Sequence, residues 1–194
     1  MRPSTFNRRR RGRSGYTLIE LLLVVALLGL AATLLIPNLV GRDAMRVQAA
    51  VRKIIGDLSF AQSDALAHQE YRRVHFYADG RGYAIERVTQ ATYATPFDPD
   101  TADYILDPIS STTGAGGRFI TDFSIDTRFE GVVITAVDID NGESHLVYDP
   151  LGGTLRAGEL PGAGGTIQLT SGTDVYEISI APFTGKLSVA RVDP

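Results

Sequence analysis

The 194-residue chain contains no cysteine and no tryptophan, and it has only three histidines and two methionines. The absence of cysteine excludes disulfide bonds, thiolate metal sites and thiol nucleophiles. The formal net charge is only −3, so the composition gives no reason to expect a nucleic-acid partner. Hydrophobic residues make up 44% of the chain, which excludes a disordered polyampholyte and leaves room for one domain with an ordinary core.

Charge is distributed unevenly along the chain. Residues 1–15 contain six arginines and no acidic residue, whereas the remainder carries a net charge of −9. A basic leader of this kind predicts a targeting segment rather than a folded strand. Residues 16–36 follow, are mostly apolar and carry one charge, Glu20. As a helix they would span about 30 Å, the thickness of a bilayer core. We therefore expect one membrane span over 16–38, with the leader in the cytoplasm and the remainder of the chain exported.

Glu20 distinguishes this segment from simpler signals. An acid within the hydrocarbon costs about 2.5–3.5 kcal/mol and usually has a partner or a function. Cleavage between Gly15 and Tyr16 would create an amine at Tyr16 that could neutralise Glu20 of the same or a neighbouring chain. A cleaved secretory signal would have a shorter apolar run and a small-x-small site, and residues 12–15 do not resemble a twin-arginine signal. A plain signal anchor leaves Glu20 unexplained.

The run Ser14-Gly15-Tyr16-Thr17-Leu18-Ile19-Glu20 resembles the prepilin leader, or class III signal, of type IV pilins and type II secretion pseudopilins. In that family, a prepilin peptidase cuts after the glycine and methylates the new N-terminus. The resemblance implies cleavage after Gly15, methylation of Tyr16 in place of the more common phenylalanine, and pairing of Glu20 with the terminal amine during filament assembly. Pro37 matches a proline found in many pilins, and we expect it to kink or locally melt the helix over 33–37.

A helical period continues over residues 39–71 and predicts an amphipathic helix. Its apolar stripe is Val47, Val51, Ile54, Leu58, Ala61 and Ala65. Polar residues, Asp57 among them, are expected on other faces. Joined to the membrane span, this segment would form one helix of about 50 residues, roughly 80 Å long.

Beyond residue 71 the period becomes two, as in strands. The strands are expected at 74–77, 83–88, 132–139, 145–148, 166–170, 175–180 and 186–190. Tight hairpins are expected at 79–82 and at Asn141-Gly142. The predicted fold is α+β: a long N-terminal helix packed on an antiparallel sheet in an exported head, 72–194, with a long variable loop at 89–117.

The turn-rich C-terminal part resembles the GspH/FimT-type minor pseudopilin domain. The matching runs are 146–153, 165–169, 178–180 and 183–187. The resemblance implies a minor pseudopilin of a type II secretion pseudopilus, partnered by other pseudopilins or pilins, in the bacterial inner membrane with its head in the periplasm. The alternative is a FimT-like minor type IV pilin that acts in pilus assembly or DNA uptake. DNA binding would require a basic surface, for which Arg72, Arg73, Arg81 and Arg87 are the candidates.

No catalytic motif is present, and we expect neither an enzyme nor a cofactor. His68 and His75 lack the spacing of a zinc protease, and Ser144, His145 and Asp149 lack a nucleophile elbow. Calcium prefers oxygen ligands from flexible loops. The candidate calcium ligands are Asp98, Asp100 and Asp103, with Asp107, and a second cluster is Asp138, Asp140 and Glu143. Neither cluster has EF-hand spacing, and the simpler interpretation is solvated loop acids and turn formers.

Overall fold

The computed structural model describes residues 15–40, 42–108 and 116–192, and for residues 32–40 and 42 it describes the backbone alone. The chain divides into two compact units, residues 1–41 and 42–194, which are described separately. The first contains helix α1 (Leu18–Val40), which continues through Pro37 and so does not melt over 33–37. The single helix expected over both segments includes residue 41, which lies outside the described residues.

In the described part of the chain, no helix combines the length and hydropathy needed to cross a membrane. The membrane span expected at 16–38 stays a prediction.

Helix α2 (Arg42–His68) opens the second unit and supplies one side of its core. Its buried stripe consists of Val47, Ala50, Val51, Ile54, Leu58, Ala61 and Ala65, none more than 5% exposed. This stripe confirms the predicted amphipathic pattern. The expectation for Asp57 was wrong, because this residue is 5% exposed and lies among the buried positions.

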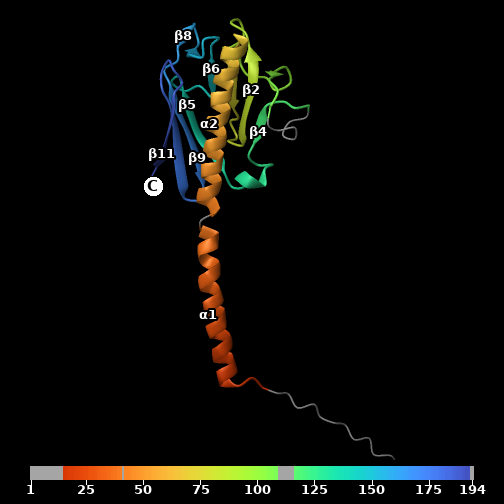
Figure 1. Ribbon diagram of the computed structural model, residues 1–194, viewed down its shortest axis with the longest axis vertical. Helices are drawn as coiled ribbons and strands as arrows, with labels where there is room; N and C mark the ends of the chain where they lie inside the picture. Colours follow the sequence, from red (N-terminus) through yellow and green to blue (C-terminus); the bar gives the residue numbers. More distant parts are fainter. Residues whose placement is uncertain (1–14, 41, 109–115, 193–194) are drawn as a thin grey trace, which may run out of the picture. The chain divides into compact units, whose positions relative to one another are not determined.

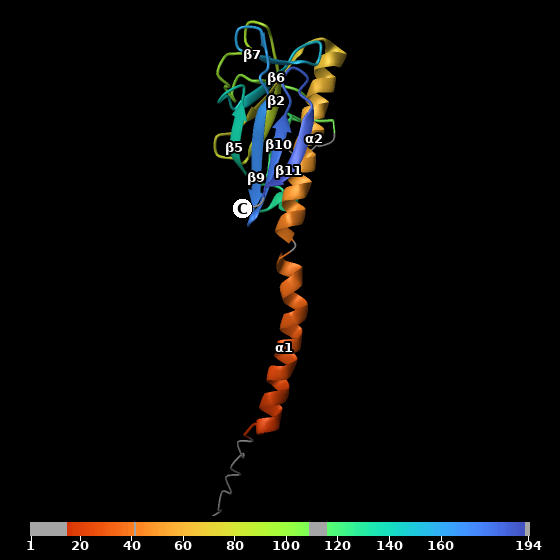
Figure 2. The ribbon, with the colours of Figure 1, turned by 90° about the vertical axis from the view of Figure 1, so that its left-hand side faces the viewer.

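Two antiparallel sheets complete the second unit (Figures 1 and 2). The first sheet has the order β3 (Asp103–Tyr104), β2 (Gly82–Val88), β1 (Tyr71–Phe76), β6 (His145–Tyr148), β7 (Thr154–Arg156) and β8 (Leu160–Pro161), with β4 (Ile120–Asp122) also paired to β2. The second has the order β11 (Leu187–Val192), β10 (Asp174–Ile180), β9 (Gly165–Ser171) and β5 (Val133–Ile139).

Helix α2 packs against strands of both sheets, and a single buried cluster joins all three. Val74 of β1 and Leu146 of β6 represent the first sheet in this cluster, and Ile167 of β9 and Ile178 of β10 represent the second. The α+β fold is therefore as predicted, with two antiparallel sheets where the sequence suggested one.

The two expected hairpins have different outcomes. Strands β1 and β2 pair around residues 79–82 as predicted, and Gly80 has φ +71°. A Cβ on Gly80 would lie 2.4 Å from the Ile134 carbonyl oxygen, and the Ile134 N–H donates to the Gly80 carbonyl at 2.9 Å, so this turn also contacts the second sheet. At Asn141-Gly142 the expected tight turn forms and is closed by an isolated antiparallel bridge between Ile139 and Glu143. The flanking strands do not extend it into a hairpin, because β5 pairs with β9 and β6 pairs with β1.

The segment expected as a long loop, 89–117, is partly ordered into the fold. Residues 103–104 form β3 against β2, and Leu106 forms an isolated bridge with Arg118. Tyr93 is buried beside Val88 and Val147 on the side of the first sheet away from α2. Residues 109–115 lie outside the described residues. The short strands β3, β4, β7 and β8 and the 3-10 helix Thr127–Phe129 were not expected, because two or three residues are too few to show a period.

Candidate processing and assembly site

The expected cleavage site lies immediately before α1. Residues 15–17 are not helical, and the Tyr16 side chain is 85% exposed. A Cβ added to Gly15 would meet no atom within 4 Å. The Gly15–Tyr16 peptide bond is therefore in a non-helical, open segment, which is what a peptidase requires of its substrate.

Thr17 and Glu20 cap the first turn of α1. The Thr17 hydroxyl accepts a hydrogen bond from the Glu20 backbone N–H at 3.3 Å, and the Glu20 carboxylate accepts one from the Thr17 N–H at 3.4 Å. This reciprocal arrangement is a capping box, which satisfies two backbone donors that the helix leaves without partners. From the sequence only an amine partner was expected for Glu20, although the Thr-x-x-Glu spacing also predicts this cap.

The described side chains of α1 present a continuous apolar surface. The large apolar residues from Leu18 to Leu28 are 46–77% exposed. Contiguous exposed apolar surface of this kind is typical of an interaction site with protein or lipid. The first unit thus combines an open peptide bond, a capped helix start and an apolar helix surface.

The four arginines considered for a DNA-binding surface are all paired with carboxylates. Arg72 and Arg73 are buried, and only Arg81 and Arg87 reach the surface. The ion pairs are Arg72 with Asp64 and Glu70, Arg73 with Glu86, Arg81 with Asp79, and Arg87 with Glu70 and Asp103. The arginine pairing lowers the pKa of Glu70, so that carboxylate stays charged and compensates its partners. These arginines do not form an open basic surface.

Several of the candidate calcium ligands have other partners. The Asp98 carboxylate accepts from the Asp100 N–H at 3.1 Å and from the Thr101 hydroxyl at 2.9 Å, and Asp103 pairs with Arg87 at 3.2 Å. In the second cluster, Asp140 accepts from the Ala163 N–H at 2.6 Å. Among the described residues, no group of three or more histidine or acidic side chains is arranged to hold a metal ion. Asp98 and Asp140 therefore stabilise turns by accepting hydrogen bonds from nearby loop residues.

A buried polar cluster around Asp57 was missed. The Tyr83 hydroxyl and the Lys53 ammonium donate to the Asp57 carboxylate, and burial is the largest cause of its raised pKa. The signal was available: position 57 is three residues after Ile54 and four before Ala61, which places it on the buried stripe.

Gln62 of α2 has a structural role that was not expected from the sequence. Its amide donates to the carbonyls of Gly152 at 2.6 Å and Thr184 at 2.9 Å, so it ties two C-terminal turns to the helix. No local pattern indicates this role.

Comparison with known proteins gives two partial matches. Residues 10–36 match the family model described as "Prokaryotic N-terminal methylation motif", so the chain carries the N-terminal motif of type IV pilin-like proteins. The chain is also similar to the type IV major pilin protein PilA of Myxococcus xanthus (strain DK1622), with 36% identity over 93 residues.

That alignment covers 48% of this chain and 40% of the pilin, so the chain spans less than half of its relative's length. No solved structure matches the chain. The methylation motif and the similarity to a pilin agree with the expectation that the chain is not an enzyme.

Proposed function

We propose that the chain is the precursor of a subunit in a pilus-type filament, cleaved by a prepilin peptidase after Gly15 and methylated at Tyr16. The observation that carries this proposal is the methylation motif over 10–36, whose expected scissile bond lies in the open segment before a capped helix. Before assembly, residues 16–38 hold the protein in the bacterial inner membrane, and the head lies in the periplasm.

Glu20 serves two purposes in this proposal. Its carboxylate has two oxygens and about four acceptor positions, so it can keep the bond to the Thr17 N–H and also accept from the new amine at Tyr16. Pairing with that amine, on the same or a neighbouring chain, offsets the cost of an acid in apolar surroundings. The apolar residues of α1 then pack against the corresponding helices of other pilins.

A type IV pilus is the machine that the comparisons favour, because the named relative is a type IV pilin. The paired arginines give no support to a DNA-uptake role.

A minor pseudopilin of type II secretion is the second candidate. The turns at Asp149 and at Thr184-Gly185, both fixed near Gln62, agree with the GspH/FimT-type resemblance. Deleting the gene separates the two: loss of surface filaments supports the pilus, and loss of folded-protein secretion with intact filaments supports the pseudopilus.

Replacing the expected cleavage residue tests processing. Gly15→Ala should leave the full leader attached, whereas Gly29→Ala, a glycine of α1 with equally open surroundings, should be processed normally. Mass spectrometry of the N-terminus of membrane-extracted protein gives the answer. A mature N-terminus at residue 16 in Gly15→Ala would contradict the proposal.

Two substitutions of Glu20 separate its charge from its capping role. Both Glu20→Gln and Glu20→Ala should be cleaved, but neither should enter filaments, because neither can neutralise the amine. A glutamine can still complete a capping box. Normal filament incorporation of Glu20→Gln would therefore show that the cap, and not the charge, supports assembly.

A further inference from the structure

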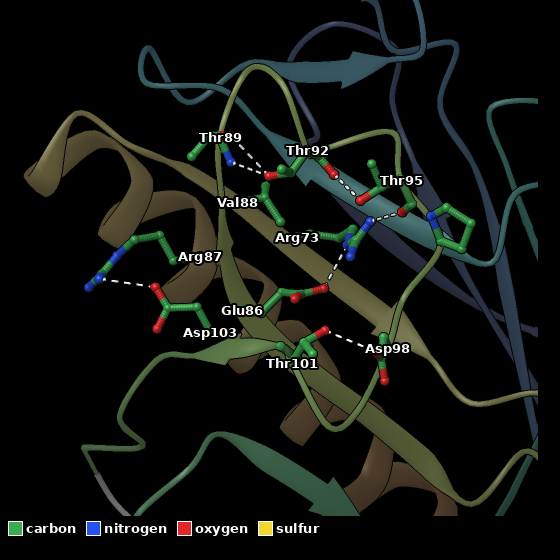
Figure 3. Close-up of a pocket in the computed structure, with 12 residues that line it drawn as sticks. Arg73, Glu86, Arg87, Val88, Thr89, Thr92, Thr95, Asp98, Thr101 and Asp103 are labelled. Carbon is green, nitrogen blue, oxygen red and sulfur yellow. Dashed lines mark hydrogen bonds and ion pairs between the residues drawn. The ribbon is translucent and has the colours of Figure 1, made fainter.

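A polar cavity of about 290 Å³ lies beside the first sheet, where residues 89–103 line it together with β1 and β2 (Figure 3). Arg73 and Glu86 are its most buried lining residues, with side chains 5% and 4% exposed. The rim carries Arg87 and Asp103, which are ion-paired to each other.

The loop that lines this cavity is held in place by hydrogen bonds. Arg73 Nη1 donates to the backbone carbonyls of Tyr93 and Thr95, and the Thr92 hydroxyl accepts from the Thr89 N–H at 2.9 Å. The Tyr93 hydroxyl accepts from the Glu159 N–H at 2.8 Å, which fixes the same loop to the segment before β8. The cavity is therefore built by specific contacts.

Hydrogen-bond acceptors are in surplus in this cavity. Glu86 Oε1 accepts from Arg73 Nε at 2.6 Å, but Glu86 Oε2 has no hydrogen-bond partner among the described residues. Asp98 accepts only from its own turn and, within the described part of the chain, has no cationic partner. The lining thus holds three carboxylates against two guanidinium groups. Burial is the largest cause of the raised pKa of Glu86, so Arg73 does not fully offset the loss of water around that carboxylate.

We propose that this cavity binds a primary ammonium group, carried either by a lysine side chain or by a free alkylamine. An ammonium has three hydrogen-bond donors and no acceptor, which complements the free oxygen of Glu86 and the carboxylate of Asp98. Val88, Pro96 and Ala102 provide apolar contact for the methylene stem. The volume is at the lower end of small-molecule sites, about 300–1,000 Å³, and suits such a slender group.

This site is independent of the filament proposal, and its test uses the full chain in detergent micelles. Isothermal titration with n-butylammonium chloride and with Nα-acetyl-lysine methylamide should give saturable binding, with a dissociation constant of about 1 mM. The neutral counterparts, n-butanol and the Nε-acetylated lysine derivative, should bind at least tenfold more weakly. Binding of butylammonium alone assigns the site to free amines, and binding of both assigns it to lysine side chains.

Matched variants locate the binding. Asp98→Asn lines the cavity and should weaken ammonium binding about tenfold. Asp100→Asn removes the same charge from the same loop but does not line the cavity, so it should bind as the unmodified chain does. Glu86→Gln should abolish binding, but it also removes the charged partner of buried Arg73. The deciding comparison is therefore between Asp98→Asn and Asp100→Asn. Equal effects of Asp98→Asn and Asp100→Asn, equal binding of the neutral compounds, or no binding by either ammonium would overturn the proposal.

Discussion

Similar apolar residues are placed in opposite surroundings in the two units of this chain. In α1, the large apolar side chains from Leu18 to Leu28 are 46–77% exposed, whereas the apolar stripe of α2 is at most 5% exposed. In the second unit, two sheets cover the apolar stripe of α2 and form the core with it. An exposed apolar surface such as that of α1 is typical of an interaction site with lipid or with other protein. The second unit therefore forms its own hydrophobic core, whereas the apolar side chains of α1 from Leu18 to Leu28 stay exposed.

Charged residues differ between the units in the same way. The head buries ion pairs such as Arg73–Glu86, while the described part of the first unit contains a single charged side chain, Glu20, at the start of its helix. Interactions that determine the stability of the head should thus be insensitive to changes in α1. Paired variants in the two units test that independence.

Breaking the buried ion pair between Arg73 and Glu86 should lower the free energy of unfolding of the head by about 4 kcal/mol. Arg73→Met leaves Glu86 buried without its partner and removes the donor to the carbonyls of Tyr93 and Thr95. Urea unfolding of the full chain, followed by tyrosine fluorescence, measures the loss. Arg81→Met, which breaks an exposed pair with Asp79, should change stability by less than about 1 kcal/mol. Equal losses in the two variants would contradict the assignment of Arg73 to the core.

Shortening one side chain of the buried stripe of α2 should lower the free energy of unfolding of the head by about 3 kcal/mol. Leu58 is fully buried in the cluster that joins α2 to both sheets, so Leu58→Ala leaves a cavity that the sheets cannot fully close. Leu22→Ala makes the same chemical change on the exposed surface of α1 and should leave urea unfolding of the head unchanged. A comparable loss from Leu22→Ala would show that the two units share a core.

His75 should make the head less stable as the pH falls. Burial, followed by the charges of Arg73 and His145, lowers its pKa from 6.5 to about 4. The folded state therefore prefers the neutral ring, and the stability it contributes is complete above pH 6.5 and lost as the pH falls toward 4. We expect a loss of about 2 kcal/mol over this window, allowing for solvent screening.

His75→Gln provides the comparison for this pH effect. The variant loses the stacking of His75 on Phe97, whose ring centroid lies 4.2 Å away, so its stability should be lower at neutral pH. Its unfolding free energy should nevertheless change less between pH 6.5 and 4. An identical pH slope in both proteins would rule out His75 as the cause.

Local patterns predicted the features that depend on neighbours in sequence. The stripe of α2 and the strands of four residues or more show clear periods, and Gly15 and Glu20 belong to one short motif. Features that depend on distant pairing were not predictable. The strands flanking Asn141-Gly142 enter different sheets because β9 and β1 offer them longer registers than they offer each other.

The ammonium cavity depends on distant pairing in the same way. It requires Arg73 of β1 to lie opposite Glu86 of β2 and beneath a loop that it also holds. The sequence marked Asp98 and Asp103 as acidic loop residues but gave no sign of the cavity between them.

The smallest effect concerns the first turn of α1, where local interactions act without a core. Thr17→Val keeps the shape of the side chain but removes the hydroxyl that accepts from the Glu20 N–H, and it should weaken the cap by about 1 kcal/mol. Hydrogen exchange at the Glu20 amide should become about fivefold faster, because that free energy corresponds to such a factor. Thr17→Ser keeps the acceptor and should exchange as the unmodified chain does, and neither variant should alter unfolding of the head. Equal exchange in Thr17→Val and Thr17→Ser would mean that α1 holds its start by other means. The cap between Thr17 and Glu20 would then not be what ends the helix before Gly15 and Tyr16.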